Sequence, residues 1–281
     1  MTAVETVRTL QDLKRKVITW RAAGEGVGLV PTMGALHEGH LQLVRLTHRR
    51  AKRCVVSIFV NPTQFAPNED FDRYPRDEAS DLGKLALVGC DLVWAHDKGV
   101  MYPEGFATRI VPGGAAEGLE SDFRPGFFAG VATVCCKLFT QVAPDMAVFG
   151  EKDYQQLRVV RQMVRDLDLA LEIVAAPTVR ESDGLAMSSR NRYLSSEQRA
   201  AAPTLHRVIV SVAKAAAEGK ETAAILDGQQ VLEAAGFRVD YLDVRDAETL
   251  KAVEPGSSRP KRVLAAAWLG KTRLIDNVAV P

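Results

Sequence analysis

The chain has 281 residues, enough for two domains, and its 47% hydrophobic and 25% charged residues are typical of an ordinary soluble protein. A formal net charge of +1 gives no general attraction to nucleic acid or to a membrane surface, and no apolar run approaches the ~20 residues that a membrane-spanning helix needs. The four cysteines form no CxxC pair and no metal-ligand spacing, so we expect reduced thiols in a cytoplasmic protein.

The first elements in the chain are a helix, a strand and a second helix. Apolar residues recur at helical spacing over residues 9–22, which predicts an amphipathic helix. The run VGLV at residues 27–30 predicts a buried strand, which a proline and a glycine then break. The amphipathic pattern resumes over residues 41–53 and predicts the second helix.

Two histidines occupy the turn between this strand and the second helix, in the segment VPTMGALHEGH of residues 30–40. His37 and His40 flank Gly39, which lets another group approach the backbone closely because it has no Cβ. Backbone N–H groups at a helix start attract anions, so this turn is a candidate phosphate site. A zinc site normally needs three or four ligands, and no third ligand stands nearby. A capped helix with two surface histidines is the other alternative.

The second helix carries a basic face made of Arg45, Arg49, Arg50, Lys52 and Arg53. Such a cluster can contact phosphates. In a chain that is nearly neutral as a whole, we interpret it as a solvated helix face instead.

Strands and helices then alternate. The β-branched and aromatic run of residues 54–60 predicts a buried strand that ends at NPTQF. Further helices are predicted over residues 77–88, 128–142 and 154–167, and further strands over residues 91–95, 145–149 and 171–175. This order predicts an α/β fold for residues 1–176, a Rossmann-like doubly wound parallel sheet with helices on both faces.

Four polar clusters follow four of these strands: HxGH, NPTQ, GEKD and TVRESDG. In open parallel sheets, ligands bind outside the carboxyl ends of the strands. The four clusters together therefore predict a nucleotide-binding site at that edge of the sheet.

Pro177 begins a different section. A polar, glycine-punctuated stretch leads to Ser195 and Gln198, whose spacing predicts a capping box at the start of a long alanine-rich helix. A further helix is predicted over residues 221–235, and strands over residues 238–244 and 262–269. We therefore expect a smaller C-terminal α+β domain over residues 177–281.

The polar clusters supply cations and amides. No GxSxG motif and no plausible Cys/His pair is present, so no protein nucleophile is indicated. Cations that converge with helix N-termini suit phosphoryl or nucleotidyl transfer. The candidate catalytic residues are His37, His40, Lys152 and Arg190. The amides suited to hydroxyl and carboxylate groups of a small substrate are Asn61, Gln64 and Gln156, although an asparagine before proline is also a common turn residue.

With these residues, the chain resembles the pantothenate synthetases (pantoate–β-alanine ligases) of the HxGH nucleotidyltransferase superfamily. The resemblance covers PTMGALHEGH, VSIFVNPTQF, DFDRYPR, GEKDYQQL, PTVRESDGLAMSSRNRYLS and TRLIDN, which span nearly the whole chain. It implies that the carboxylate of pantoate attacks the α-phosphorus of ATP to give pantoyl adenylate and pyrophosphate, and that the amine of β-alanine then displaces AMP. It also implies magnesium, a cytoplasmic homodimer, and a C-terminal lid domain.

The resemblance also assigns residues. ATP binding falls on Met33, Gly34, Ala35, Leu36, His37, Glu38, Gly39, His40, Gly150, Glu151, Lys152, Asp153, Val179, Met187, Ser188, Ser189 and Arg190. His40 matches the histidine usually assigned as the proton donor. Gln64 matches the contact to pantoate and β-alanine, and Gln156 matches the second pantoate contact. No residue is assigned to a metal.

One departure from the family pattern concerns Phe127. The family usually reads RPGHF where this chain has Arg124-Pro125-Gly126-Phe127-Phe128. We expect Phe127 to pack near the wall of the substrate pocket and the enzyme to be active without that histidine.

Two other functions stay open from the sequence. One is another adenylyltransferase of the same superfamily that acts on a phosphorylated small molecule, which would need more cations and no β-alanine. The other is a non-catalytic RNA- or nucleotide-binding module that uses the basic helix. Such a module would bind RNA in a salt-dependent way and would not turn over ATP.

Overall fold

The computed structural model describes residues 3–66, 69–254 and 257–281. These residues form two compact units. Unit 1 comprises the described residues of 1–113, 124–151 and 159–177, and unit 2 those of 114–123, 152–158 and 178–281. Residues 114–123 and 152–158, which the sequence assigns to the first domain, thus belong to unit 2.

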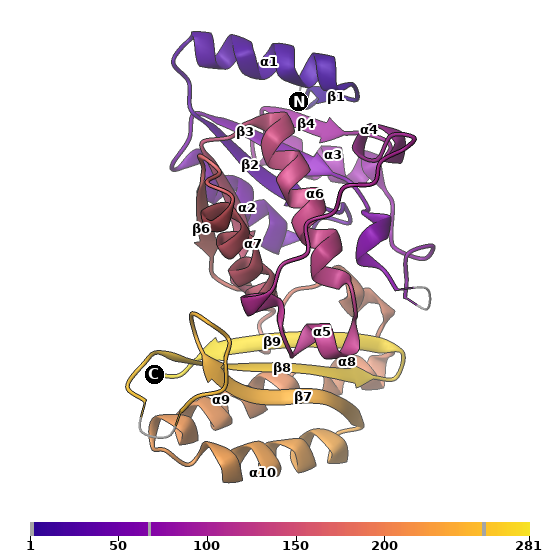
Figure 1. Ribbon diagram of the computed structural model, residues 1–281. Helices are drawn as coiled ribbons and strands as arrows, with labels where there is room; N and C mark the ends of the chain where they lie inside the picture. Colours follow the sequence, from indigo (N-terminus) through magenta and orange to yellow (C-terminus); the bar gives the residue numbers. More distant parts are fainter. Residues whose placement is uncertain (1–2, 67–68, 255–256) are drawn as a thin grey trace. The chain divides into compact units, whose positions relative to one another are not determined.

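Unit 1 is built on a parallel sheet (Figure 1). The described residues give it six strands in the order β1-β4-β3-β2-β5-β6. The strands are β1 (Thr6–Val7), β2 (Val27–Thr32), β3 (Arg53–Ile58), β4 (Leu92–Ala95), β5 (Met146–Gly150) and β6 (Glu172–Ala176). The predicted Rossmann-like sheet is therefore confirmed, and β1 is an addition that the sequence did not indicate.

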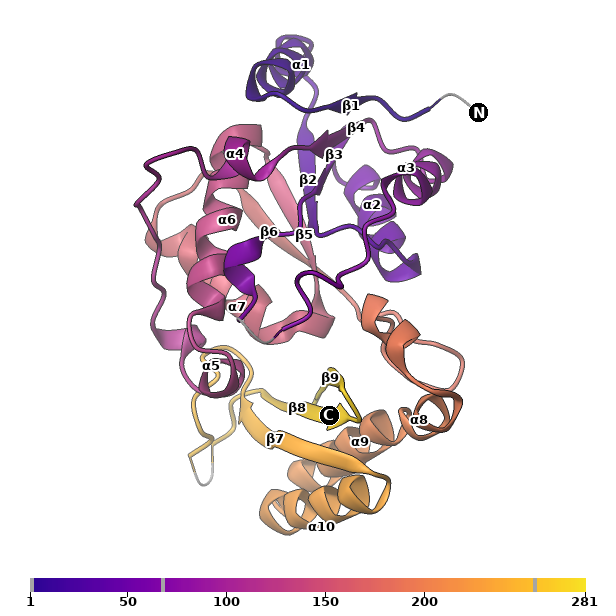
Figure 2. The same ribbon diagram turned by 90° about the vertical axis from the view of Figure 1, so that its right-hand side faces the viewer.

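Helices cover both faces of this sheet. Helices α2 and α3 lie on one side and α6 on the other (Figure 2). The helices are α1 (Leu10–Ala22), α2 (Glu38–His48), α3 (Glu78–Leu87), α4 (Lys98–Met101), α6 (Phe127–Val142) and α7 (Tyr154–Asp166). Because both faces are covered, the central strands are continuous apolar runs, and Leu29, Val55 and Val148 are fully buried.

The bounds of α2 differ from the prediction. The helix begins at Glu38 and ends at His48, rather than running over residues 41–53. It begins earlier because the side chain of His37 caps it, which brings His40 into its first turn. It ends earlier because Arg53 already belongs to β3.

Unit 2 contains an antiparallel sheet of three strands in the described residues, β7 (Phe237–Asp246), β8 (Lys261–Leu269) and β9 (Thr272–Ala279). Helices α9 (Thr204–Ala217) and α10 (Glu221–Ala234) cover one face of this sheet, and the short helix α5 (Glu120–Phe123) lies on the other (Figure 1). The predicted α+β architecture is confirmed, whereas β9 was not predicted.

The predicted long helix after Ser195 is wrong in one respect. The capping box exists, since Ser195 Oγ accepts from the backbone N–H of Gln198 at 3.2 Å and Gln198 Oε1 accepts from that of Ser195 at 3.0 Å. The helix is nevertheless divided into α8 (Ser196–Ala201) and α9, because Pro203 between them has no N–H to continue the ladder. Among the described helices, none is long and apolar enough to cross a bilayer.

Candidate active site

The turn after β2 is held by a buried carboxylate. Gly34 and Ala35 both have left-handed backbone, with φ of 78° and 51°. Asp81 on α3 is 2% exposed, and its two oxygens accept from the backbone N–H groups of Ala35 and Leu36, each at 2.8 Å. Lys84 Nζ donates to the carbonyl of Leu36 at 2.8 Å. These bonds stabilise a conformation that alanine rarely adopts, and they fix the chain directly before His37.

The two histidines form an unusual cap at the start of α2. His37 Nδ1 accepts from the backbone N–H of Gly39 at 3.2 Å, and His40 Nδ1 accepts from that of His37 at 3.3 Å. The ring centroids are 4.2 Å apart. Because Nδ1 of each ring is an acceptor, each neutral ring carries its proton on Nε2. The cap therefore sets both rings as Nε2–H donors at a helix N-terminus, where anions are favoured.

This turn lies at the switch point of the sheet. β2 pairs with β3 on one side and with β5 on the other, although β5 comes much later in the chain. Gly150 ends β5 and Glu151 follows it. The carboxyl ends of β2 and β5 are thus neighbours, which is where an open α/β sheet binds its ligand.

The segment after β3 is organised by Asn61, which is 1% exposed. Its Nδ2 donates to Gln64 Oε1 at 2.8 Å and to the carbonyl of Gly130 at 3.2 Å. Its Oδ1 accepts from the hydroxyl of Tyr102 at 2.9 Å and from that of Thr63 at 2.9 Å. Both amide protons are therefore used inside the protein, and one of them orients the side chain of Gln64.

Helix α6 passes very close to this segment. A Cβ added at Gly130 would lie 2.3 Å from the carbonyl oxygen of Thr63, so only glycine fits there. The short 3-10 helix Pro62–Gln64 is thereby seated directly on α6.

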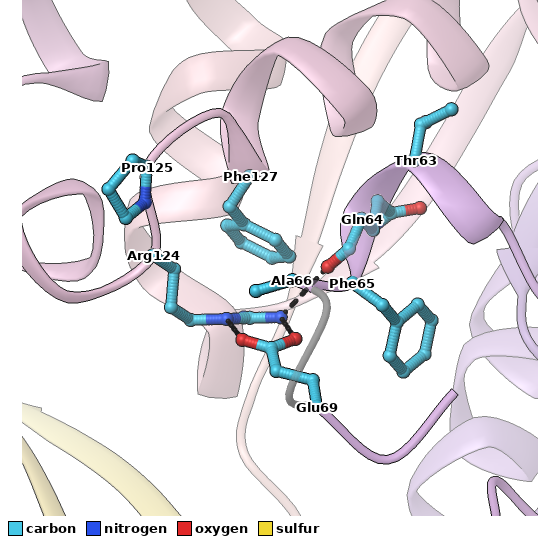
Figure 3. Close-up of a pocket in the computed structure, with 8 residues that line it drawn as sticks. All are labelled: Thr63, Gln64, Phe65, Ala66, Glu69, Arg124, Pro125 and Phe127. Atoms are coloured by element: carbon cyan, nitrogen blue, oxygen red, sulfur yellow. Dashed lines mark hydrogen bonds and ion pairs between the residues drawn. The ribbon is translucent and has the colours of Figure 1, made fainter. Parts of the chain in front are cut away.

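A small pocket opens beside Gln64 (Figure 3). It is lined by Thr63, Gln64, Phe65, Ala66, Glu69, Arg124, Pro125 and Phe127. Arg124 binds Glu69 with two ion-pair bonds of 2.6 and 2.7 Å and donates to the carbonyl of Gln64 at 3.0 Å. The Arg124 guanidinium carbon lies 3.7 Å from the ring centroid of Phe127. Phe127 thus lies at the wall of this pocket, as its position in the sequence suggested, and stacks on the arginine that holds Gln64.

Three of the five basic residues in and directly after α2 form ion pairs with acidic residues. Arg45 binds Glu38, and Arg50 binds Glu172 at 3.0 Å. Arg53 binds Glu25 at 2.6 Å. The hydrogen bond from Arg45 holds the pKa of Glu38 below its ordinary value. These ion pairs favour the interpretation of a solvated helix face over a nucleic-acid surface.

The remaining candidates belong to unit 2. Lys152 lies in the 3-10 helix Glu151–Asp153, with its Nζ 3.9 Å from Asp153 Oδ2. Gln156 is half-buried in the first turn of α7. The backbone N–H of Met187 donates to the carbonyl of Val179 at 3.0 Å, so these two candidates are adjacent.

The predicted site residues are thus divided between the units. Unit 1 holds Met33, Gly34, Ala35, Leu36, His37, Glu38, Gly39, His40, Asn61, Gln64, Gly150 and Glu151. Unit 2 holds Lys152, Asp153, Gln156, Val179, Met187, Ser188, Ser189 and Arg190.

Sequence reasoning missed the residues that hold these candidates in place. Asp81 gave a detectable signal, because it shares a face of α3 with buried Leu85, and a carboxylate on an apolar helix face is unusual. Glu69 and Arg124 gave none, since 55 positions separate them and their pairing depends on the fold.

Comparison with known proteins identifies relatives of the whole chain. Residues 5–279 match the family described as pantoate-beta-alanine ligase. The chain is 58% identical over 275 residues to the pantothenate synthetase of a Bradyrhizobium species, covering 97% of each sequence. It is 55% identical to that of Caulobacter vibrioides, covering 100% of both.

Solved structures give the same result. The chain is similar to the pantothenate synthetase of Thermus thermophilus, with a TM-score of 0.91, 48% identity and 99% of each chain covered. It is also similar to the pantoate-beta-alanine ligase of Francisella tularensis complexed with beta-gamma ATP and beta-alanine, with a TM-score of 0.83 and 30% identity. That match covers 99% of this chain and 98% of the other.

Proposed function

The chain belongs to the pantoate–β-alanine ligase family, and we propose that it forms pantothenate in two steps with the residues described above. It is an ATP-dependent ligase that joins pantoate to β-alanine. The family and the activity expected from the sequence motifs are therefore confirmed. The roles of individual residues, the magnesium ion and the homodimer are our proposals.

In the first step, a carboxylate oxygen of pantoate attacks the α-phosphorus of ATP. A bond from that oxygen to phosphorus forms, the bond to the β-phosphate oxygen breaks, and pyrophosphate leaves. Negative charge builds on the phosphate oxygens during this exchange. We propose that His37 and His40 donate through Nε2–H to these oxygens, because their Nδ1 atoms are already engaged by backbone N–H groups.

In the second step, the amine of β-alanine attacks the carbonyl carbon of pantoyl adenylate. The bond between that carbon and the bridging oxygen breaks, AMP leaves, and the amine loses a proton. We propose that Gln64 orients pantoate and β-alanine, and that Asn61 acts by orienting Gln64. Gln156 is proposed as the second contact to pantoate.

Lys152, Arg190 and Asp153 complete the assignment. We propose that the two cations offset charge on the phosphates and that Asp153 accepts from the ribose hydroxyls. The other residues of the ATP-binding set are proposed to contact the nucleotide as the family resemblance implies.

Magnesium is proposed to arrive with the nucleotide. Mg²⁺ is usually bound through one or two carboxylates together with substrate phosphates. The described residues contain no group of three or more His, Cys, Asp or Glu side chains placed to hold a metal ion. A magnesium ion bound through the phosphates of ATP would partly neutralise their charge.

The single observation that carries the proposed mechanism is the imidazole cap, formed by His37 and His40 at the switch point of the sheet. In this cap both rings are N–H donors, which suits charge stabilisation and not nucleophilic attack by the protein. Oxygen labelling tests the chemical path. Pantoate labelled with heavy oxygen in its carboxylate should deliver label into the phosphate of AMP. Unlabelled AMP, or ADP as the nucleotide product, would contradict the acyl-adenylate path, because phosphorylation by the γ-phosphate releases ADP.

We also propose a cytoplasmic homodimer that acts on small molecules and binds neither nucleic acid nor membrane. The division into a nucleotide- and pantoate-binding domain, residues 1–176, and a lid domain, residues 177–281, is likewise a proposal. Light scattering coupled to size-exclusion chromatography tests the oligomeric state, and a monomeric mass with full activity would contradict it.

A further inference from the structure

The motif TRLIDN of residues 272–277 has no role in the mechanism so far. It begins strand β9 of unit 2, in which successive side chains point to opposite faces of the sheet. Asp276 faces α9, and Asn277 faces the opposite side. Both are almost fully buried, with exposures of 4% and 3%. Buried polar side chains of this kind need defined partners.

Asn277 donates to the backbone of Lys152. Its Nδ2 lies 2.9 Å from the carbonyl oxygen of Lys152. Its Oδ1 accepts from Arg262 Nε at 2.6 Å. Because arginine can only donate, this contact sets which end of the amide is oxygen and directs the N–H₂ group toward Lys152.

The backbone of Asn277 is itself held. Its N–H donates to Asp276 Oδ1 at 2.8 Å. Asp276 receives two bonds from Arg180, of 2.7 and 2.9 Å, and lies 3.4 Å from His206 Nδ1. Burial alone would raise the pKa of Asp276, but the interactions with nearby His206 and with Arg180 outweigh burial and lower that pKa. Asp276 is thus an ionised anchor for its neighbour on the strand.

The segment that carries Lys152 is also held on its other side. Tyr154 follows Asp153 directly, and the guanidinium carbon of Arg262 lies 3.8 Å from the centroid of its ring. The hydroxyl of Tyr154 donates to the carbonyl of Ala247 at 2.8 Å. Arg262 therefore contacts both Asn277 and Tyr154.

We propose that Asn277 is a positioning residue for adenylation, which places Lys152 by fixing its backbone carbonyl. The inference rests on the proposed role of Lys152 at the phosphates. Asn277 bonds to the main chain of Lys152 and therefore does not occupy its ammonium group.

Asn277→Asp tests this with little change in shape. The aspartate keeps an oxygen for Arg262 but has no N–H for the carbonyl of Lys152, and it places a second oxygen against that carbonyl. Displacing a catalytic group by about 1 Å can slow a reaction ~10²-fold. We expect the single-turnover rate constant of pantoyl adenylate formation to fall ~10- to 100-fold, with KM for pantoate unchanged. Asn277→Ala, which buries no charge, replaces the aspartate variant if that variant does not fold.

A double-mutant cycle with Lys152→Ala separates positioning from general damage. If Asn277 acts through the Lys152 side chain, Asn277→Asp slows the Lys152→Ala enzyme by less than about twofold. A full additional loss in that background overturns the inference. So does a normal rate for Asn277→Asp in the presence of Lys152. If instead Lys152→Ala is itself fully active, the proposed role of Lys152 fails.

Asp240→Asn is the matched control. Asp240 is a buried carboxylate on β7 that accepts from Trp268 Nε1 at 3.0 Å and from Arg273 Nε at 2.8 Å. The variant makes the reverse exchange, carboxylate to amide, at a buried side chain of the same sheet that has no bond to Lys152. It should lower the melting temperature and leave the adenylation rate constant within about twofold. An equal loss of rate in this control would show that the sheet as a whole matters and would overturn a specific role for Asn277.

Discussion

Replacing Asp81 by asparagine should both destabilise unit 1 and slow adenylation. The carboxylate accepts from the backbone N–H groups of Ala35 and Leu36, and asparagine offers only one oxygen to these two donors. One buried N–H then loses its partner, which costs about 1–3 kcal/mol, and the other bond loses its charge assistance, about 1 kcal/mol more.

The sum of about 2–4 kcal/mol predicts a lower melting temperature. A unit of 150–250 residues melts roughly 2–4 °C lower per kcal/mol, so we expect a shift of about 5–15 °C by calorimetry. Because Leu36 precedes His37, the loosened turn should also displace the imidazole cap. We expect the single-turnover adenylation rate constant to fall ~10²-fold.

Asp77→Ala provides the control on the same helix. Asp77 caps α3 by accepting from the backbone N–H of Ser80 at 3.0 Å, and its loss costs about 0.5–2 kcal/mol. This variant should melt earlier and adenylate pantoate normally. The reasoning would be refuted by Asp81→Asn enzyme with a normal adenylation rate, or by an equal loss of rate in Asp77→Ala.

His37→Ala and His40→Ala should fold with a lower melting temperature, because each loses a cap of α2, and should lose ~10²–10³ of the adenylation rate, since each removes one preorganised donor; near-normal turnover of either would contradict the assignment. Gln64→Ala should weaken pantoate use far more than ATP binding, which calorimetric titration of each ligand would check. Phe127→Ala should raise KM for pantoate ~5-fold, because Arg124 loses the ring beneath it, and an unchanged KM would count against this contact. Burial lowers the pKa of His96 from its ordinary value of 6.5. Below pH 6.5 the unfolded chain therefore binds more protons than the folded one, and the free energy of unfolding decreases as the pH decreases. His96→Phe should therefore flatten the fall of the melting temperature below pH 6.5, and an unchanged slope would refute this.

Much of unit 1 is predictable because its strands are buried on both faces. A run such as residues 54–60, in which Ser57 is the single polar residue, is then almost continuously apolar, which is typical of a strand buried on both faces. Strand β9 is different. Its buried Thr272, Asp276 and Asn277 place polar groups on both faces, so the period of two disappears from the hydrophobic pattern. Strand β1 has only two residues, too few for any pattern.

The start of α2 illustrates a second limit. Caps are usually serine, threonine, aspartate or asparagine, and the sequence LHEGHL contains none of them. The amphipathic pattern alone predicts that the helix begins at Leu41. Two imidazoles perform the same function here by accepting from backbone N–H groups. The residues of the site were predictable, but their second role as caps was not.

The contacts that position the candidate residues share one feature. Asp81 binds the N–H groups before His37, Arg124 binds the carbonyl of Gln64, and Asn277 binds the carbonyl of Lys152. In each case a side chain distant in sequence is bonded to the main chain of the candidate or of the residues directly before it. Such bonds fix the backbone while they leave the functional group to the substrate. Every residue has a backbone carbonyl, and every residue except proline has a backbone N–H. A side chain that bonds to the main chain therefore does not require a particular residue type at the position that it holds. Motif patterns can therefore indicate which side chains perform the chemistry. Of the three positioning residues, Asp81 gives a signal in the sequence as a carboxylate on an apolar helix face, whereas the bonds of Arg124 and Asn277 become identifiable only once the chain is folded.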